Sequence, residues 1–152
     1  MLEDRDRESG VRGQESGVGS QESARAGVRS AKELVVYEKA FALAMQVFDL
    51  TKNFPPEERY ALTSQIRRSS HSVCLNLREA WAKRRYPAHF VSKLTDCDGE
   101  NSETDSSLDF AHACGYLTAS NHGELTAISH EVGRMLGTMI KNPTPFLLTP
   151  DS

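Results

Sequence analysis

The sequence of 152 residues lacks the features that would indicate a membrane protein or an enzyme. It has no apolar run of about 18 residues and no charged start followed by a hydrophobic stretch, so neither a membrane span nor a secretory signal is indicated. Nucleophile elbows of the Gly-x-Ser-x-Gly type, phosphate loops and dinucleotide fingerprints are absent from residues 31–142. We therefore expect a cytoplasmic protein with no enzymatic activity, no cofactor and no membrane contact.

Cysteine and net positive charge are also scarce. Cys74, Cys97 and Cys114 are an odd number at wide spacings, which fits neither a disulfide framework nor a zinc site with close ligand pairs. The formal net charge of -3 gives no global basicity that would indicate nucleic-acid binding. With 38% hydrophobic and 26% charged residues, the composition is that of an ordinary globular protein.

Residues 1–30 cannot form a packed core. They contain no aromatic residue, and no hydrophobic residue larger than valine after the first two positions. A seven-residue repeat runs through them, because ESGV at 8–11 returns at 15–18. One valine per repeat is too few for a coiled coil, so a disordered Gly/Ser-rich tail is predicted. A duplicated DNA element or a misplaced translation start would also account for the repeat.

Four segments carry the apolar periodicity of amphipathic helices. The predicted helices run from about Lys32 to Asn53, from Glu57 to Arg85, from there to about Tyr116, and from a cap at Ser120 or Asn121 to just before Pro143. Prolines separate these segments, and Gly115 is typical of a helix stop. Short loops make sequential helices antiparallel. An all-α, up-down-up-down four-helix bundle is therefore predicted over 31–142, followed by a flexible C-terminal tail over 143–152.

The first predicted helix has an unusually wide apolar face. Two stripes lie side by side at helical spacing, one from Val36 to Leu50 and the other from Tyr37 to Phe48. A stripe of about 100° suffices for a helix that packs on one side only. The extra width predicts a contact outside the helix's own core, for which a subunit interface is one interpretation.

Four short motifs carry a family resemblance: LVVYEKA at 34–40, LTSQIRRS at 62–69, NLREA at 76–80, and FA through GYL at 110–117. Over about residues 34–141 the chain resembles the 23S rRNA-intervening sequence proteins, small bacterial four-helix bundles first noticed as reading frames inside ribosomal RNA genes. The resemblance implies a ring, commonly a homopentamer, without established enzymatic activity. A related bundle, the accessory variability protein of diversity-generating retroelements, binds nucleic acid and a reverse transcriptase. Family members usually carry proline at position 74 and glycine at 80, so Cys74 and Ala80 indicate a divergent branch.

Charge is unevenly distributed within the predicted bundle. Six basic residues and one acid lie between positions 67 and 85, a balance of +5, whereas six acids and no base lie between 96 and 109, a balance of -6. Antiparallel packing would set these runs partly against each other, so mutual neutralisation within or between subunits is the first interpretation. The alternative is binding of RNA or DNA, for which one helix end gathers the best patch: Lys83, Arg84, Arg85 and Tyr86.

Five polar residues tend toward the predicted interior. Charged groups inside a bundle are costly unless they are paired, so a buried ion-pair network is expected among Arg67, Glu79, Glu103, Asn76 and Asn101. A metal site is the weaker interpretation. Di-metal bundles need a Glu-x-x-His step on two helices, and the nearest match is a single Asp109-x-x-His112, so no metal site is predicted.

Small residues follow one line of the fourth predicted helix: Ser129, Gly133 and Gly137, at four-residue steps. Glycine inside a helix costs about 1 kcal/mol relative to alanine, so two on one line predict a close contact with another helix backbone.

Two classes of function are compatible with these features. The first is a self-assembling scaffold that holds protein partners, including copies of itself, through the broad face of the first helix. The second is a ring that binds RNA or DNA through the corner at residues 83–86.

Overall fold

The structure is a computed structural model that describes residues 28–149. Four long helices make up this range: α3 (Val35–Thr51), α4 (Leu62–Ala82), α5 (Pro87–Ala113) and α6 (Ala119–Lys141). Three short 3-10 turns accompany them: η1 (Ala31–Glu33), η2 (Pro56–Glu58) and η3 (Thr144–Phe146). The predicted all-α four-helix fold is confirmed. The tail predicted over 1–30 lies outside the described residues except for 28–30.

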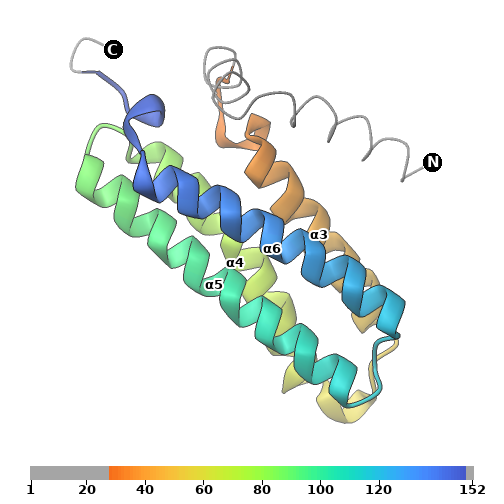
Figure 1. Ribbon diagram of the computed structural model, residues 1–152. Coiled ribbons are helices and arrows are strands. Elements are labelled where there is room, and N and C mark those ends of the chain that lie inside the picture. The colour runs from red at the N-terminus through yellow and green to blue at the C-terminus, as the bar shows by residue number, and fades with distance from the viewer. Residues whose placement is uncertain (1–27, 150–152) are drawn as a thin grey trace.

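Each long helix packs on two others. Helix α4 contacts α3 and α5, and α6 contacts α5 and α3. Figure 1 shows that consecutive helices run in opposite directions and that α3 and α6 close the bundle. The α4–α5 connection and residues 142–149 therefore lie at one end of the bundle, and the other two connections lie at the opposite end.

Two helices begin later than the sequence predicts, because a non-helical residue interrupts each of them. Leu34 is extended (φ −71°, ψ 138°) between η1 and α3, and its side chain is buried in the core. Ala61 (φ −125°, ψ −106°) separates η2 from α4. A side-chain oxygen of Glu58 accepts the Leu62 N–H at 3.3 Å, which satisfies one of the free amides of the first turn of α4.

The turn between α5 and α6 is set by local hydrogen bonds. Gly115 adopts φ +82°, and the N–H groups of Tyr116 and Gly115 donate to the carbonyls of Ala111 and His112. This is the Schellman pattern, in which a left-handed glycine closes the last helical turn. Thr118 caps α6, because its hydroxyl accepts the Asn121 N–H at 3.0 Å. The predicted caps, Ser120 and Asn121, lie inside the helix instead.

A polar belt divides the core into two apolar clusters. The larger cluster lies toward the α4–α5 connection and includes Leu77, Leu94 and Leu136. The smaller cluster lies at the other end and includes Ile66 and Leu108. Between the two clusters are buried polar residues from three helices: Ser69, Ser70, Asn101, Thr104 and Ser129. Hydrogen bonds link belt residues of different helices, including one of 2.7 Å between the hydroxyls of Ser69 on α4 and Thr104 on α5.

The C-terminal segment packs on the bundle, in contrast to the flexible tail predicted for 143–152. Phe146 is 6% exposed and its ring stacks on Phe90, with centroids 6.5 Å apart. The Leu148 N–H donates to the Arg84 carbonyl at 3.2 Å. Pro143 ends α6 and turns the chain back, so that a large apolar side chain completes the larger cluster. Residues 150–152 lie outside the described range.

Candidate functional site

The outward face of α3 carries apolar side chains in contact with solvent. Val35 is 42% exposed, Phe41 51% and Met45 43%, and Ala42 lies exposed among them. The inward face of the same helix is buried in the core. Helix α3 therefore has a buried apolar inner side and an outer side on which exposed apolar residues alternate with Glu38 and Asp49, and within residues 28–149 this outer side remains open to solvent.

Cations lie over aromatic rings along the α4 side of this face. The guanidinium carbon of Arg67 is 4.7 Å from the ring centroid of Phe48. The guanidinium carbon of Arg78 is 6.0 Å from the ring centroid of Tyr37, whose ring stacks on Phe41. Each such contact contributes about 0.5–1 kcal/mol at an exposed site. The arrangement sets positive charge directly beside the apolar surface of α3.

The predicted nucleic-acid-binding corner is only partly available. Lys83, Arg85 and Tyr86 are exposed between α4 and α5. The Arg84 guanidinium lies 3.7 Å from the Trp81 ring centroid, and its Nε donates to the Trp81 carbonyl at 2.8 Å. Burial in this position lowers the pKa of Arg84. Arg84 therefore holds the turn together, and the four-residue patch is reduced to three exposed residues.

Ion pairs connect the basic run of α4 to the acidic run of α5. Arg68 donates hydrogen bonds to Glu103 and Glu100, which raise the pKa of its guanidinium, the contact with Glu103 having the larger effect. In a second ion pair α5 supplies the cation and α4 the carboxylate: Lys93 on α5 lies 2.6 Å from Glu79 on α4. Their hydrogen bond raises the pKa of Lys93 and lowers that of Glu79. The two charge runs thus neutralise each other in part within the chain.

Arg68 was missed as a site residue by reasoning from sequence. The signal that identifies it is the three-residue step from Glu100 to Glu103, which lets two carboxylates on one side of α5 reach a single guanidinium.

The five residues predicted to share one buried network lie in separate places. Arg67 donates from Nε to Thr51 Oγ1 at 2.7 Å, on α3. Glu79 and Glu103 form the surface ion pairs with Lys93 and Arg68. Asn76 donates to the Ser72 carbonyl at 2.9 Å, within its own helix.

Asn101 alone among these five is buried, at 5% exposure, and it faces Ser129. The single buried network is therefore not formed. The outer sides of α4 and α5 meet at the bundle surface, where charges pair without full desolvation.

In the line of small residues on α6, Gly133 leaves space for the side chain of Asn101. A Cβ placed on Gly133 would lie 3.4 Å from Nδ2 of Asn101, and Ser129 is 1% exposed beneath the same amide. A Cβ placed on Gly137 would meet nothing within 4 Å. Close approach of a second backbone at Gly137 is therefore absent within residues 28–149, and a contact there between subunits stays a prediction.

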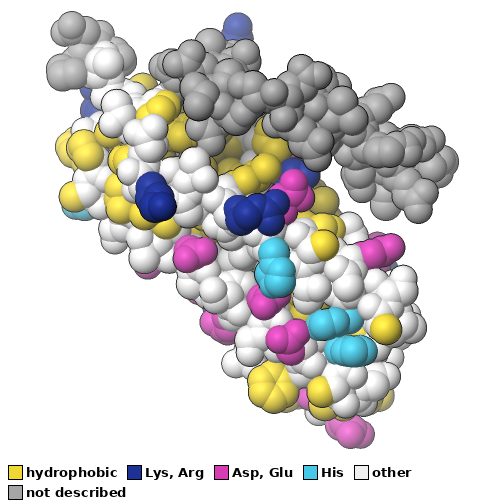
Figure 2. All heavy atoms as spheres, viewed as in Figure 1, with side chains coloured by type: hydrophobic (Ala, Val, Ile, Leu, Met, Phe, Trp, Pro, Cys, Tyr) yellow, Lys and Arg dark blue, Asp and Glu magenta, His cyan; other side chains and the backbone are white. Residues whose placement is uncertain are grey.

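Histidines and aspartates pair across α5 and α6. Figure 2 shows imidazole and carboxylate groups lying near one another on this side of the molecule. His122 Nε2 is 2.8 Å from Asp109 Oδ1, and the His122 ring stacks on His112 with centroids 4.4 Å apart. The Asp109-x-x-His112 step thus takes part in a pairing with His122. In the described part of the chain, no group of three or more histidine, cysteine, aspartate and glutamate side chains is arranged to hold a metal ion.

Among the described residues, no helix is both long enough and apolar enough to span a bilayer.

A family model described as "23S rRNA-intervening sequence protein" matches residues 32–138. Among solved structures, the chain is similar to a protein of unknown function from the S23 ribosomal protein family of Bacteroides thetaiotaomicron VPI-5482. The sequences are 28% identical, the similarity covers 71% of this chain and 96% of that chain, and the TM-score is 0.65. A comparison with curated proteins gives no match.

Proposed function

Because the chain belongs to the 23S rRNA-intervening sequence protein family, we propose that it is a non-enzymatic, self-assembling scaffold that binds copies of itself and other proteins through the outer face of α3. One observation carries this proposal. Val35, Phe41 and Met45 keep between 42% and 51% of their surface in contact with solvent on a helix whose other side is already buried. Exposed apolar surface of this kind marks interaction sites in globular proteins.

The energetics favour association through this face. Complete burial of a side chain of this size contributes roughly 1.5–3 kcal/mol, and about half of that is still to be gained at each of the three positions. Leu75 on the outer side of α4 is another exposed apolar side chain, at 61%. The neighbouring Arg67 and Arg78 add charge that discriminates between partners and fixes register. A homopentameric ring, which the family resemblance implies, would use this face once in every subunit.

The test is the mass of the full chain in solution, measured by light scattering after gel filtration and by native mass spectrometry. The wild-type protein should exceed the monomer mass of 16.9 kDa. Phe41→Glu/Met45→Glu should give a folded monomer with an unchanged circular dichroism spectrum. Tyr60→Glu, at a position 86% exposed in the α3–α4 connection, is the matched control and should assemble like the wild type. A monomeric wild type, or an assembled double variant, would contradict the proposal.

RNA or DNA binding through the corner at residues 83–86 is the second candidate function. Its supporting observation is that Lys83, Arg85 and Tyr86 are exposed beside the start of α5. Tyr86 occupies the N-cap position without capping the helix, and Pro87 follows it. Amides in the first turn of a helix attract anions. A phosphate group near this corner would therefore meet two cations and the positive end of α5.

The corner is tested by titrating fluorescent single-stranded and duplex RNA at several salt concentrations. Lys83→Glu/Arg85→Glu should abolish salt-sensitive binding. The slope of log K against the logarithm of the salt concentration reports about 0.7–0.9 released counterions per phosphate contact. Lys52→Glu/Arg59→Glu changes two exposed cations at the opposite end of the bundle and is the control. If both double variants weaken binding equally, the attraction is diffuse. If the wild type does not bind at low salt, nucleic-acid binding is excluded.

A further inference from the structure

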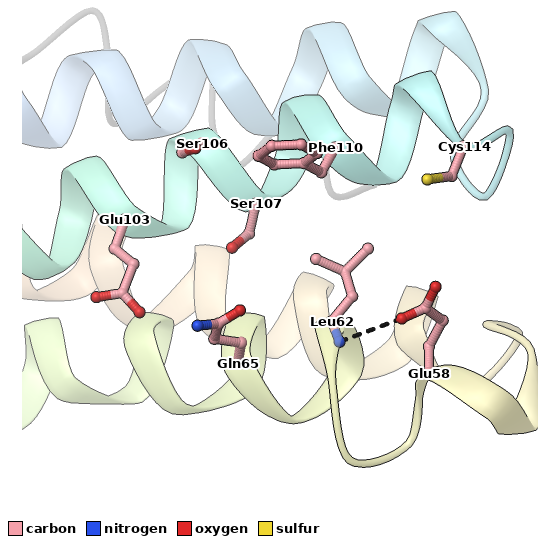
Figure 3. Close-up of a pocket in the computed structure, with 8 residues that line it drawn as sticks. All are labelled: Glu58, Leu62, Gln65, Glu103, Ser106, Ser107, Phe110 and Cys114. Atoms are coloured by element: carbon pink, nitrogen blue, oxygen red, sulfur yellow. Dashed lines mark hydrogen bonds between the residues drawn. The ribbon is translucent and has the colours of Figure 1, made fainter.

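A groove of about 470 Å³ lies between α4 and α5, away from both surfaces considered above. Figure 3 shows its lining residues, of which the argument uses six: Glu58, Leu62, Gln65, Glu103, Ser107 and Phe110. Its volume is in the range of pockets that take small molecules, about 300–1,000 Å³. The groove is open to solvent along one side of the bundle, near the connections at 52–61 and 114–118.

One hydroxyl in the lining of this groove has no partner within residues 28–149. Ser107 is 6% exposed, and its side chain makes no hydrogen bond with any described residue. Thr104, one turn earlier, donates to the Glu100 carbonyl at 3.0 Å in the manner usual for a helical hydroxyl. Figure 3 shows the Ser107 oxygen directed from α5 toward α4. The Ser107 oxygen is not one of the enclosed side-chain atoms that lack a partner, so it opens into the groove, where a donor group of a ligand can reach it.

The only charged side chains in the lining are carboxylates. Glu58 accepts a hydrogen bond of 2.8 Å from the Tyr116 phenol, which fixes the carboxylate in place. The same contact raises the pKa of Tyr116 to about 12. Glu103 receives the Arg68 hydrogen bond on Oε2, and within residues 28–149 its Oε1 has no hydrogen bond. Arg68 offsets part of the charge of Glu103, so the preference of the lining for a cationic over an anionic ligand comes from Glu58 and the remaining oxygen of Glu103.

The apolar part of the groove lies next to these acceptors. Phe110 is 62% exposed and follows Ser107 by one turn on α5, and Leu62 faces it from α4. An exposed phenylalanine beside two carboxylates offers a surface for an apolar stem and a ring face for a cation.

We propose that this groove binds an organic cation, with a planar guanidinium or amidinium head between Glu103, Ser107 and Gln65 and an apolar stem on Leu62 and Phe110. A planar head with several N–H donors matches a carboxylate oxygen, a hydroxyl and an amide oxygen at once. The site does not depend on assembly through α3 or on the corner at 83–86. The same head group could belong to a free small molecule or to an arginine side chain of a polypeptide.

The probe is benzamidinium, titrated into the ¹⁵N-labelled full chain and followed by amide chemical shifts. Shifts should be confined to the groove segments of α4 and α5, and neutral benzamide, of the same shape, should bind about tenfold more weakly. Glu103→Gln and Phe110→Ala should each weaken benzamidinium binding severalfold. Glu124→Gln removes an exposed carboxylate on α6 and should leave the affinity unchanged. Equal binding of benzamide and benzamidinium, or an unaltered affinity in Glu103→Gln, would overturn the proposal.

Ser107→Ala separates a ligand site from a packing defect. This variant should fold about as stably as the wild type, because the hydroxyl makes no hydrogen bond within residues 28–149, and it should bind benzamidinium more weakly. A second arm uses a capped tripeptide, acetyl-Gly-Arg-Gly-amide. If the tripeptide displaces benzamidinium, the groove accepts an arginine side chain of a polypeptide, and if only benzamidinium binds, the groove is restricted to free small molecules. Chemical shift changes scattered over the whole surface would contradict both an arginine ligand and a small-molecule ligand in this groove.

Discussion

Asn101 on α5 donates a hydrogen bond of 2.8 Å from Nδ2 to the backbone carbonyl of Ser129 on α6. The amide is 5% exposed and lies at the middle of the polar belt, under Gly133. Because its donor faces a carbonyl oxygen, the position requires a neutral side chain that can donate. This requirement leads to the first prediction.

Asn101→Asp should destabilise the bundle by about 3 kcal/mol at pH 7, because it places a carboxylate against a carbonyl oxygen inside the core. Burial raises the pKa of such a carboxyl above its unfolded value of about 3.9, so the folded state binds the proton more tightly. Stability is therefore greatest at low pH and is lost as the pH rises from the unfolded pKa to the folded pKa. Urea titrations at pH 4 and pH 7 measure the difference from the wild type. The control is Asn76→Asp on the half-buried surface of α4, which should show little of this pH-dependent loss of stability. An equal loss for Asn101→Asp at both pH values would contradict the explanation.

Phe146→Ala should lower the free energy of unfolding by about 3 kcal/mol, because it leaves a cavity against the buried Phe90 ring. Urea denaturation monitored by circular dichroism gives the value. Thr144→Ala, at an exposed position in the same turn, should change stability by no more than about 0.5 kcal/mol. A loss below that level for Phe146→Ala would show that residues 143–149 do not contribute to the core.

Only Cys114 should react with a thiol reagent at pH 8 in the folded chain. Burial raises the pKa of Cys74 to about 11 and that of Cys97 to about 12, so at pH 8 both remain protonated as well as inaccessible, whereas Cys114 is exposed. The thiolate is the reactive form. Mass spectrometry after iodoacetamide treatment should find one adduct, three adducts in urea, and none in folded Cys114→Ser. Rapid formation of a second adduct without urea would contradict the packing of α4 against α5.

Gly137→Ala and Gly115→Ala should have opposite effects. A methyl group at Gly137 meets nothing within 4 Å, so alanine should stabilise the helix by up to about 1 kcal/mol. Gly115 has φ +82°, where alanine is strained and should cost about 1–2 kcal/mol. Melting temperatures of both variants provide the test. If Gly137→Ala lowers the assembled mass, then Gly137 lies in a contact between subunits.

The sequence predicts the helices well and their first residues poorly. Apolar spacing identifies each long helix because burial of one face is a property of the segment itself. The starts at Leu34 and Ala61 depend on contacts made elsewhere in the fold, such as the burial of the Leu34 side chain. The same limit explains Phe146, because a short apolar stretch after a proline gives no periodic signal for docking.

The candidate surfaces could be predicted only in part. The width of the apolar face of the first helix indicates the exposed residues of α3 directly. A count of charges cannot show that Arg84 folds back on Trp81, because the stacking depends on the turn that follows α4. The groove beside Phe110 joins residues about fifty positions apart, and its one local signal is that Phe110 lies off the apolar stripe of α5.

The polar belt makes the two ends of the bundle unequal in their resistance to opening. Sixteen buried residues of the described chain belong to the larger cluster and eight to the smaller one, and each cluster draws on all four helices. Opening free energies vary within a fold according to how much apolar surface each part buries. Amide protons of Leu62–Ile66, the last turns of α5 and the start of α6 should therefore exchange with solvent faster than those around Leu77 and Leu94. We expect the bundle to open first at the end that holds the groove, and a ligand bound there should slow this exchange.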